Sequence, residues 1–193
     1  IVESRTRAWG EGAAPRPKAF SQIAPEAQPY NLPTGWRWVR LGQLGVASPG
    51  SPPPSSQADA FGGSTPFIGP GQISAAGLIS TGEKSLSDKG RSLSTVARPK
   101  DLLMVCIGGS IGKSALADRE LAFNQQINSL TVLDANPEFV HLVMRSPEFQ
   151  QSVLSAASGS ATPIINRSKW EDLPVPLPPL AAQLRIVAKD TEL

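Results

Sequence analysis

The sequence predicts an α+β domain in which a mixed or antiparallel sheet carries long loops and a few helices, followed by the start of a coiled-coil-type helix. Three observations favour this class. The chain holds 17 glycines and 19 prolines in 193 residues, well above the roughly 12% that both types contribute to an average protein. Short apolar runs alternate with glycine turns, and clear helix starts come only after residue 135. Because Gly and Pro destabilise helix interiors, a mainly helical fold is excluded.

The composition excludes several classes of protein. Cys106 is the only cysteine and His141 the only histidine, which is too few for a disulfide framework or for the usual zinc sites. No apolar run reaches the roughly 20 residues of a membrane span, and no secretory signal pattern opens the sequence. We therefore expect a cytoplasmic protein with no metal and no membrane partner.

Three segments are expected along the chain. Residues 1–31 are rich in Gly and Pro and lack periodicity, which indicates a linker or wrapping segment. Residues 32–178 hold the main domain, and residues 179–193 begin a further helix. Because the sequence starts at Ile1 and stops inside that helix, we interpret it as a fragment.

The strands are expected in the first two thirds of the main domain. The run 36–41 alternates as a strand would, and 101–107 is the strongest apolar run, flanked by Pro-Lys and Gly-Gly. A proline-rich stretch at 49–56 is an irregular loop. The full set of expected strands is 36–41, 65–73, 101–107, 114–117 and 126–133.

The helices follow, and their starts are signalled locally. An Asn-Pro-Glu sequence at 136–138 and a Ser-Pro-Glu sequence at 146–148 each combine an N-cap, a first-turn proline and an acid. We expect two packed helices with a break near Arg145. The proline-rich run 173–179 is neither helix nor central strand, so we interpret it as a stiff extended spacer before the last helix.

One motif suggests catalysis. The sequence 108–112 matches G-x-S-x-G, the nucleophile elbow of α/β hydrolases, and Asp134 and His141 follow Ser110 in the hydrolase order. A small serine hydrolase using these three residues is therefore an alternative. A glycine turn between two strands is the favoured explanation, because short matches are common in a glycine-rich sequence and His141 lies within an expected helix. The same turn is one residue too short for a phosphate-binding loop.

Positive charge gathers on the loops. Between residues 84 and 100 five basic residues stand against a single acid, Asp88, and further basic residues lie on Gly- and Ser-rich loops. Such loops suit phosphate contacts, which position a protein on DNA, although a solvated face is the simpler interpretation. The candidate DNA-contacting residues are Lys84, Lys89, Arg91, Arg98, Lys100, Ser110, Lys113, Arg167 and Lys169.

Other notable residues have structural explanations. The amides at 124–126 and at Asn128 are better explained as turn caps than as readers of adenine edges. Trp36 and Trp38 are expected to be core anchors, and Cys106 an inert core residue.

Taken in order, these features resemble the target recognition domain of the specificity subunit of type I restriction–modification enzymes. The resemblance covers about Leu32 to Val187, and Gln72 departs from it because an acidic residue is common there. The matching stretches are 32–38 with Leu41-Gly42, 101–103 leading through Ile107 to 108–113, 124–126, 162–166, and 173–180 with Gln183, Arg185, Ile186 and Val187.

The resemblance implies a non-catalytic DNA-binding domain that reads one half of a bipartite double-stranded target. It also implies partners: a methyltransferase subunit, a restriction and translocase subunit, and a second recognition domain in the same subunit or in a second copy. S-adenosylmethionine, ATP and Mg²⁺ would be bound by those partners and no cofactor by this chain. The last helix would contact its partner through Leu180, Leu184 and Val187. A recognition domain of a fused methyltransferase–endonuclease is a further alternative.

Overall fold

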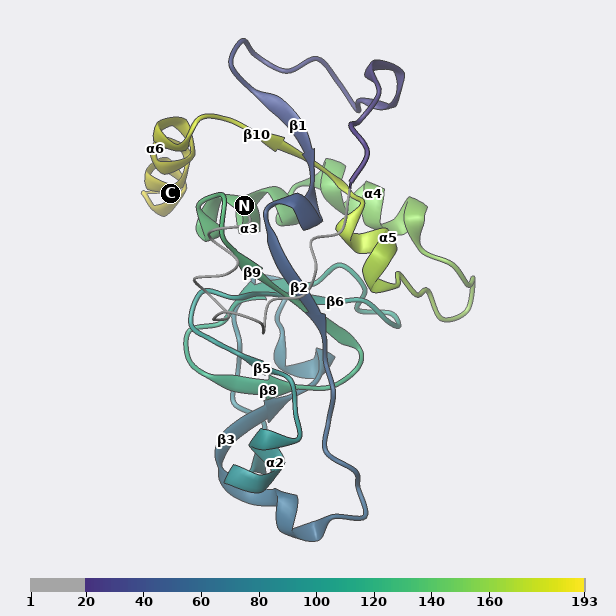
Figure 1. The fold of residues 1–193 in the computed structure, drawn as a ribbon, viewed down its shortest axis with the longest axis vertical. Helices are drawn as coiled ribbons and strands as arrows, with labels where there is room; N and C mark the ends of the chain where they lie inside the picture. The colour runs from purple at the N-terminus through teal and green to yellow at the C-terminus, as the bar shows by residue number, and fades with distance from the viewer. Residues whose placement is uncertain (1–19, 193) are drawn as a thin grey trace.

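The structure is a computed structural model that describes residues 20–192 (Figure 1). Its strands are β1 Arg37–Arg40, β2 Gly45–Pro49, β3 Phe61–Ile68, β4 Ser85–Leu86, β5 Val96–Ala97, β6 Leu102–Val105, β7 Ser114–Leu116, β8 Leu121–Phe123, β9 Ile127–Val132 and β10 Pro174–Leu177. Its α-helices are α2 Asp88–Ser92, α3 Pro137–Arg145, α4 Pro147–Ala156, α5 Arg167–Glu171 and α6 Leu180–Thr191. Short 3-10 helices span Pro25–Ala27, Leu41–Gln43, Ala58–Ala60 and Pro70–Gln72.

A central antiparallel sheet, in the order β2-β9-β6-β7, separates two hydrophobic cores. On β6, Leu102 and Met104 belong to the core that includes residues of α3, α4 and α5, whereas Leu103 and Val105 belong to the core shared with β8. Successive side chains on a strand point to opposite faces, so covering both faces requires an uninterrupted apolar run. The apolar run predicted at 101–107 is therefore the strand that divides the molecule.

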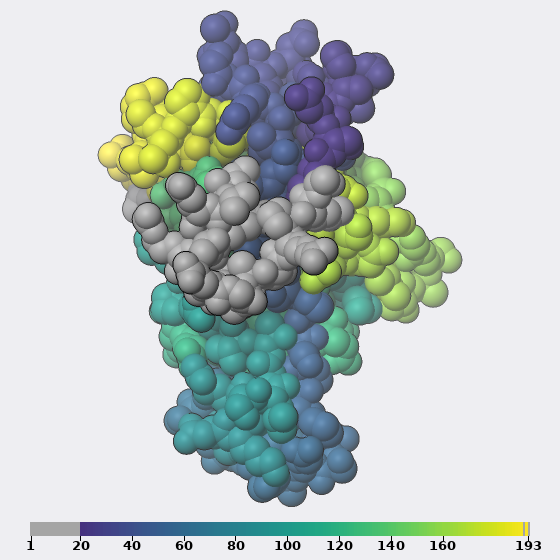
Figure 2. Space-filling model, viewed as in Figure 1, coloured from purple at the N-terminus to yellow at the C-terminus, as the bar shows by residue number. Residues whose placement is uncertain are grey.

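A second sheet, in the order β4-β3-β8-β5, lies toward one end of an elongated molecule (Figure 1). Strand β8 pairs in parallel with β3 and antiparallel with β5, which confirms the predicted mixed or antiparallel class. We call residues 51–100, which hold β3, β4, α2 and β5, the distal lobe. Figure 2 shows this blue and teal region at the opposite end of the molecule from α6.

The proline-rich segment is a strand and not the expected spacer. β10 pairs antiparallel with β1 in a sheet of two strands, with Val175 opposite Val39. Its prolines, Pro174 and Pro176, occupy alternate positions, and they therefore remove N–H groups from one edge of the strand only. Long-range pairing with β1 explains why an isolated reading of the prolines missed this strand.

The helix starts are confirmed. The Phe139 N–H donates to Asn136 Oδ1 (2.8 Å) at the start of α3, and the Phe149 N–H donates to Ser146 Oγ (3.3 Å) at the start of α4. Ser146 lies in the extended region and serves both as the end of α3 and as the cap of α4. The predicted break near Arg145 is therefore present. Within residues 20–192, no helix is long and apolar enough to cross a membrane.

The other expected strands are partly correct. The runs 114–117 and 126–133 correspond to β7 and β9, whereas the strand predicted at 65–73 ends at Ile68 and is followed by a 3-10 turn. The short strands β4, β5 and β8 were missed because two or three residues carry too little periodicity. Most of the predicted linker lies outside the described residues, but residues 20–31 contact β1, where Trp38 Nε1–H donates to the Tyr30 carbonyl (3.2 Å).

Candidate nucleic-acid interface

The residues predicted to contact DNA fall into two groups in the structure. Lys89 and Arg91 lie on α2 of the distal lobe, Lys84 and Arg98 lie in the loops beside β4 and β5, and Lys100 lies at the end of the lobe. Ser110 and Lys113 lie in the turn that contacts α4 through Gln150, and Arg167 and Lys169 lie on α5. The basic segments 84–100, 108–113 and 158–169 therefore do not form a single patch. Two of them come together, and the third lies apart.

The second group is assembled by backbone contacts between distant segments. The Gly108 N–H donates to the Pro163 carbonyl (2.9 Å), and Ile107 forms an antiparallel bridge with Ile164. The turn at 108–113 therefore lies beside the loop at 158–166. Gly108 and Gly112 adopt positive φ angles of 93° and 89°, a region that favours glycine, so the turn needs these two residues.

In the first group, three basic side chains are held by acids. Lys89 Nζ lies 2.7 Å from Asp59 Oδ2, and Lys100 Nζ lies 2.8 Å from Glu138 Oε1. Arg91 makes a bidentate contact with Glu120, at 2.6 and 2.9 Å. These pairs hold the pKa values of the three carboxyl groups below their usual range.

The remaining candidates differ in how they are held. Lys169 Nζ donates to the Ala156 carbonyl (3.0 Å) and to Ser158 Oγ (2.9 Å), which places its charge at the C-terminal end of α4, where cations are favoured. The Arg167 side chain lies 3.9 Å from Glu171, at the limit of an ion pair.

Lys84, Arg98 and Lys113 are the predicted cations without a side-chain hydrogen bond or an ion pair within the described part of the chain. Lys84 and Arg98 are exposed, and Lys113 is half-buried. A basic side chain with no protein partner can bind a phosphate without first giving up an internal contact. These three are therefore the side chains best prepared for a polyanion.

The turn at 108–113 is a tight connection between β6 and β7. Three of its N–H groups are used within the hairpin: Ile111 donates to the Gly108 carbonyl (3.0 Å), Gly112 to the Val105 carbonyl (2.9 Å) and Lys113 to the Ser110 carbonyl (3.1 Å). These N–H groups are unavailable to cradle a nucleotide phosphate. The glycine-turn interpretation of the G-x-S-x-G match is the one that the geometry favours.

His141 lies away from Ser110, as far as the described contacts show. It is buried on α3 against the Ser114 carbonyl, and the hairpin residue Gly77 lies so close that a Cβ on it would stand 2.8 Å from His141 Cε1. Burial lowers the pKa of His141. Across residues 20–192 no hydrogen bond joins His141 to the Ser110 hydroxyl, so nothing in this geometry supports the hydrolase alternative.

The amides after β8 act within the protein. Asn124 Oδ1 accepts from the Gln126 N–H (3.0 Å), and Asn124 Nδ2 donates to Gln126 Oε1 (3.1 Å). This arrangement agrees with the predicted role as a turn cap. Cys106 is buried, and burial raises the pKa of its thiol to about 12, as suits an inert core residue.

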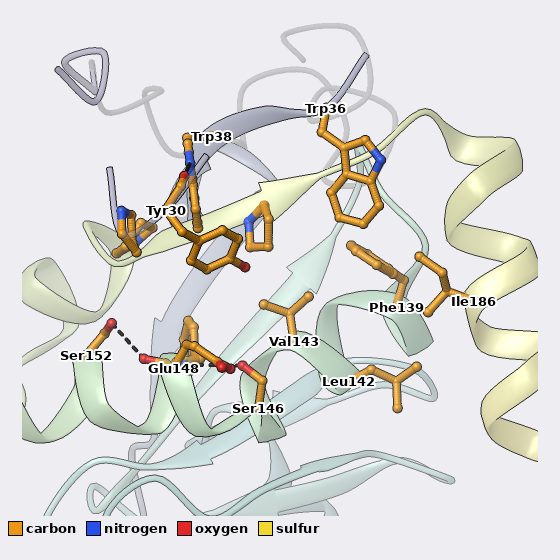
Figure 3. A pocket seen from close by; sticks show the side chains of 14 residues that line it. Tyr30, Trp36, Trp38, Phe139, Leu142, Val143, Ser146, Glu148, Ser152 and Ile186 are labelled. Carbon is orange, nitrogen blue, oxygen red and sulfur yellow. Dashed lines mark hydrogen bonds between the residues drawn. The ribbon is translucent and has the colours of Figure 1, made fainter. Parts of the chain in front are cut away.

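Trp36 and Trp38 are not core anchors; both are half-exposed and line an apolar pocket (Figure 3). The Tyr30 ring meets Trp38 edge-on, with centroids 5.0 Å apart. Glu148 lies on the opposite wall, and burial together with this carboxylate raises the pKa of Tyr30. Sequence reasoning missed this pocket because its walls come from β1, β10, α3, α4 and α6, which only the tertiary fold brings together.

Comparison with known proteins defines the class of this domain. Residues 33–189 match the family described as the type I restriction modification DNA specificity domain, and the chain belongs to that family. Its role is accordingly DNA recognition. Specificity subunits are the non-catalytic components of restriction–modification complexes.

Two curated relatives share this assignment. The chain is 23% identical over 205 residues to the EcoEI specificity subunit of Escherichia coli, with 100% of this chain and 33% of the relative covered. It is 23% identical over 159 residues to the MjaIX specificity subunit of Methanocaldococcus jannaschii, with 80% and 37% covered. The chain therefore spans about a third of the length of these relatives.

A solved structure has the same fold. The HsdS subunit from Thermoanaerobacter tengcongensis superposes with a TM-score of 0.67 at 26% identity, over 85% of this chain and 38% of that chain.

Proposed function

We propose that this chain reads one half of a bipartite double-stranded DNA target as part of a type I specificity subunit, and that it catalyses no reaction itself. Because the chain spans only about a third of its curated relatives, a second recognition domain has room elsewhere in the subunit or in a second copy. The observation that carries the DNA contact is that the charged groups of three predicted cations, Lys84, Arg98 and Lys113, make no hydrogen bond or ion pair among the described residues.

In this proposal different side chains provide the affinity for DNA and the discrimination between base sequences. Basic side chains on the loops neutralise phosphates and release counterions, so affinity falls as salt rises. A smaller number of side chains read base edges, and each good contact contributes about 1–3 kcal/mol of discrimination. The paired cations Lys89, Arg91 and Lys100 take part only if phosphate competes with their acids.

The partners in this proposal are the methyltransferase subunit and the restriction and translocase subunit. These subunits would supply S-adenosylmethionine, ATP and Mg²⁺, and the complex would act in the cytoplasm. Helix α6 would contribute to assembly through Leu180 and Leu184, which are 57% and 51% exposed. Val187, the third predicted contact, packs against the core of its own domain and is therefore less available.

The test uses the full-length specificity subunit that contains this chain, assembled with its methyltransferase subunit. DNA affinity is measured against salt for the wild type and for a variant combining Lys84→Ala, Arg98→Ala and Lys113→Ala. Each lost phosphate contact should reduce the slope of log affinity against log salt by about 1. An unchanged slope would show that these side chains do not contact DNA.

A matched variant removes three cations that are already paired, Lys89, Arg91 and Lys100. We expect a smaller change in slope for this variant. Equal affinity of the specificity subunit for random DNA and for the target that its complex methylates would contradict the proposed function as a whole.

A further inference from the structure

A small hairpin stands between β3 and β4. Ile73 and Ile79 form an antiparallel bridge, the Ser74 N–H donates to the Leu78 carbonyl (3.0 Å), and the Leu78 N–H donates to Ser74 Oγ (3.0 Å). Ile73 is buried in the core beneath the second sheet. Gly77 has a positive φ of 81° and packs against His141 on α3. The 73–79 hairpin is therefore held against the rest of the protein through Ile73 and Gly77, whereas positions 74–76 and 78 are exposed.

The hairpin presents a leucine to solvent. Leu78 is 70% exposed, and its neighbours at positions 75–77 are Ala, Ala and Gly. No charged residue occurs between residues 73 and 82. Single exposed leucines are common on protein surfaces, so exposure alone assigns no role to Leu78. Ala75 and Ala76, the exposed small residues near Leu78, however, allow another molecule to approach this side of the hairpin closely.

A polar hollow lies at the base of the same hairpin. It has a volume of about 510 Å³, and its walls include Gln72, Glu83, Lys84 and Asn124. Gln72 Oε1 accepts from the Gly69 N–H (3.0 Å), which fixes the amide and leaves its Nε2 group without a partner among the described residues. Lys84 likewise has no described partner. Hairpin and hollow together offer an apolar tip, an amide donor and a cation.

This combination fits the major groove of DNA. The groove is about 12 Å wide and accepts a two-stranded ribbon, and it presents thymine methyl groups, base acceptors and flanking phosphates. An apolar tip suits the methyl, an amide donor suits a base acceptor, and a free cation suits a phosphate.

We propose that the 73–79 hairpin enters the major groove of the half-target, with Leu78 against the C5-methyl group of a thymine. Gln72 donates to a neighbouring base, and Lys84 contacts the backbone beside it. This inference rests on the proposed function and adds to it the element that reads bases, together with one chemical group that is read.

The experiment removes only the methyl group. The target is first mapped from the methylated positions that the assembled complex leaves on DNA. Each thymine of the half-target is then replaced in turn by deoxyuridine, and the affinity of the assembled complex is measured. The wild type should lose about fourfold in affinity at one thymine, which corresponds to the transfer of a single buried carbon group.

The variant Leu78→Ala should bind the natural duplex more weakly and show no further loss with deoxyuridine at that thymine. Because Leu78 is largely exposed, this variant should fold normally. Leu154→Ala is the matched control, since Leu154 on α4 is 54% exposed. It should keep the full sensitivity to the methyl group.

Three results would overturn the inference. The first is a wild type that is insensitive at every thymine, and the second is a Leu78→Ala variant that is as sensitive as the wild type. The third is a Leu78→Ala variant that loses only its assembly with the methyltransferase subunit, which would assign the hairpin to a protein contact. In each case the wild type would still prefer its mapped target, so the proposed function would stand. A wild type with no such preference would overturn both.

Discussion

The central sheet and the distal lobe are stabilised in different ways. The central sheet is covered on both faces, and its strand β6 is entirely buried. The distal lobe contributes only a few residues to one of the two hydrophobic cores, among them Ile68 and Ile73, and it adds close backbone approaches, such as that of Gly90 to Ala60, and exposed ion pairs. A scaffold with two cores tolerates changes in loops at its edge. The central sheet thus stabilises the fold, whereas the distal lobe is the region where surface residues can vary.

The largest expected effect concerns the hydrophobic core beside the central sheet. Trp170 on α5 is fully buried in the core that contains Leu102 and Met104. Trp170→Ala leaves a large cavity and should lower the free energy of unfolding by about 3–5 kcal/mol. Urea unfolding measures this loss. Trp36→Ala is the control, because Trp36 is half-exposed and its loss should cost clearly less; equal losses would contradict the comparison.

The second effect tests the distal lobe. In an exposed helix Gly→Ala stabilises by up to about 1 kcal/mol, but a Cβ on Gly90 of α2 would collide with the Ala60 carbonyl oxygen. Gly90→Ala should therefore destabilise the protein by about 1–3 kcal/mol. Limited proteolysis should show cleavage within residues 51–100 first. A gain in stability would mean that α2 does not pack closely here.

The third effect concerns the contact between α3 and the 73–79 hairpin. Burial lowers the pKa of His141 and Arg145 lowers it further, whereas the hydrogen bond to the Ser114 backbone and the charge of Asp190 oppose this shift. In the unfolded chain the pKa of His141 is about 6.5, above its value in the folded chain. Between these two pKa values the unfolded chain binds more protons than the folded chain. The free energy of unfolding therefore falls as the pH falls from 7 to 5. Asp59, Glu120 and Glu138, whose pKa values are lowered, titrate below this window.

Unfolding curves at pH 7 and pH 5 measure this dependence. His141→Gln removes the titrating group and should reduce the difference in the free energy of unfolding between pH 7 and pH 5. A variant that keeps the full pH dependence would show that another group is responsible.

The smallest effect compares two arginines of the distal lobe. The Arg98 guanidinium makes no hydrogen bond or ion pair in the described structure and acts on Glu120 only through its charge, whereas Arg91 is held by Glu120 through two hydrogen bonds. Arg98→Ala should reduce the salt slope of DNA binding by about 1, and Arg91→Ala by less. Salt titrations of the assembled complex provide the measurement. A larger change for Arg91→Ala would show that DNA displaces Glu120.

Local features of the fold were predictable. The capping sequences before α3 and α4 set both helix starts because the bonds concerned join residues three apart. The glycine turn between β6 and β7 was predictable for the same reason. The site was predictable only in part: the basic loops were found, but their grouping and their pairing with acids were not.

The sequence by itself determined the class of the fold, the helix starts, the apolar strand at the centre and the basic character of the loops. Each depends on neighbouring residues or on the periodicity of a single element. The tertiary structure alone decided that the proline-rich run pairs with β1 and that β8 runs parallel to β3. It also decided that Lys89 meets Asp59 while Lys84 meets no acid among the described residues. These outcomes depend on contacts between residues far apart in the chain, and no local propensity encodes which distant partner a strand or a charge will find.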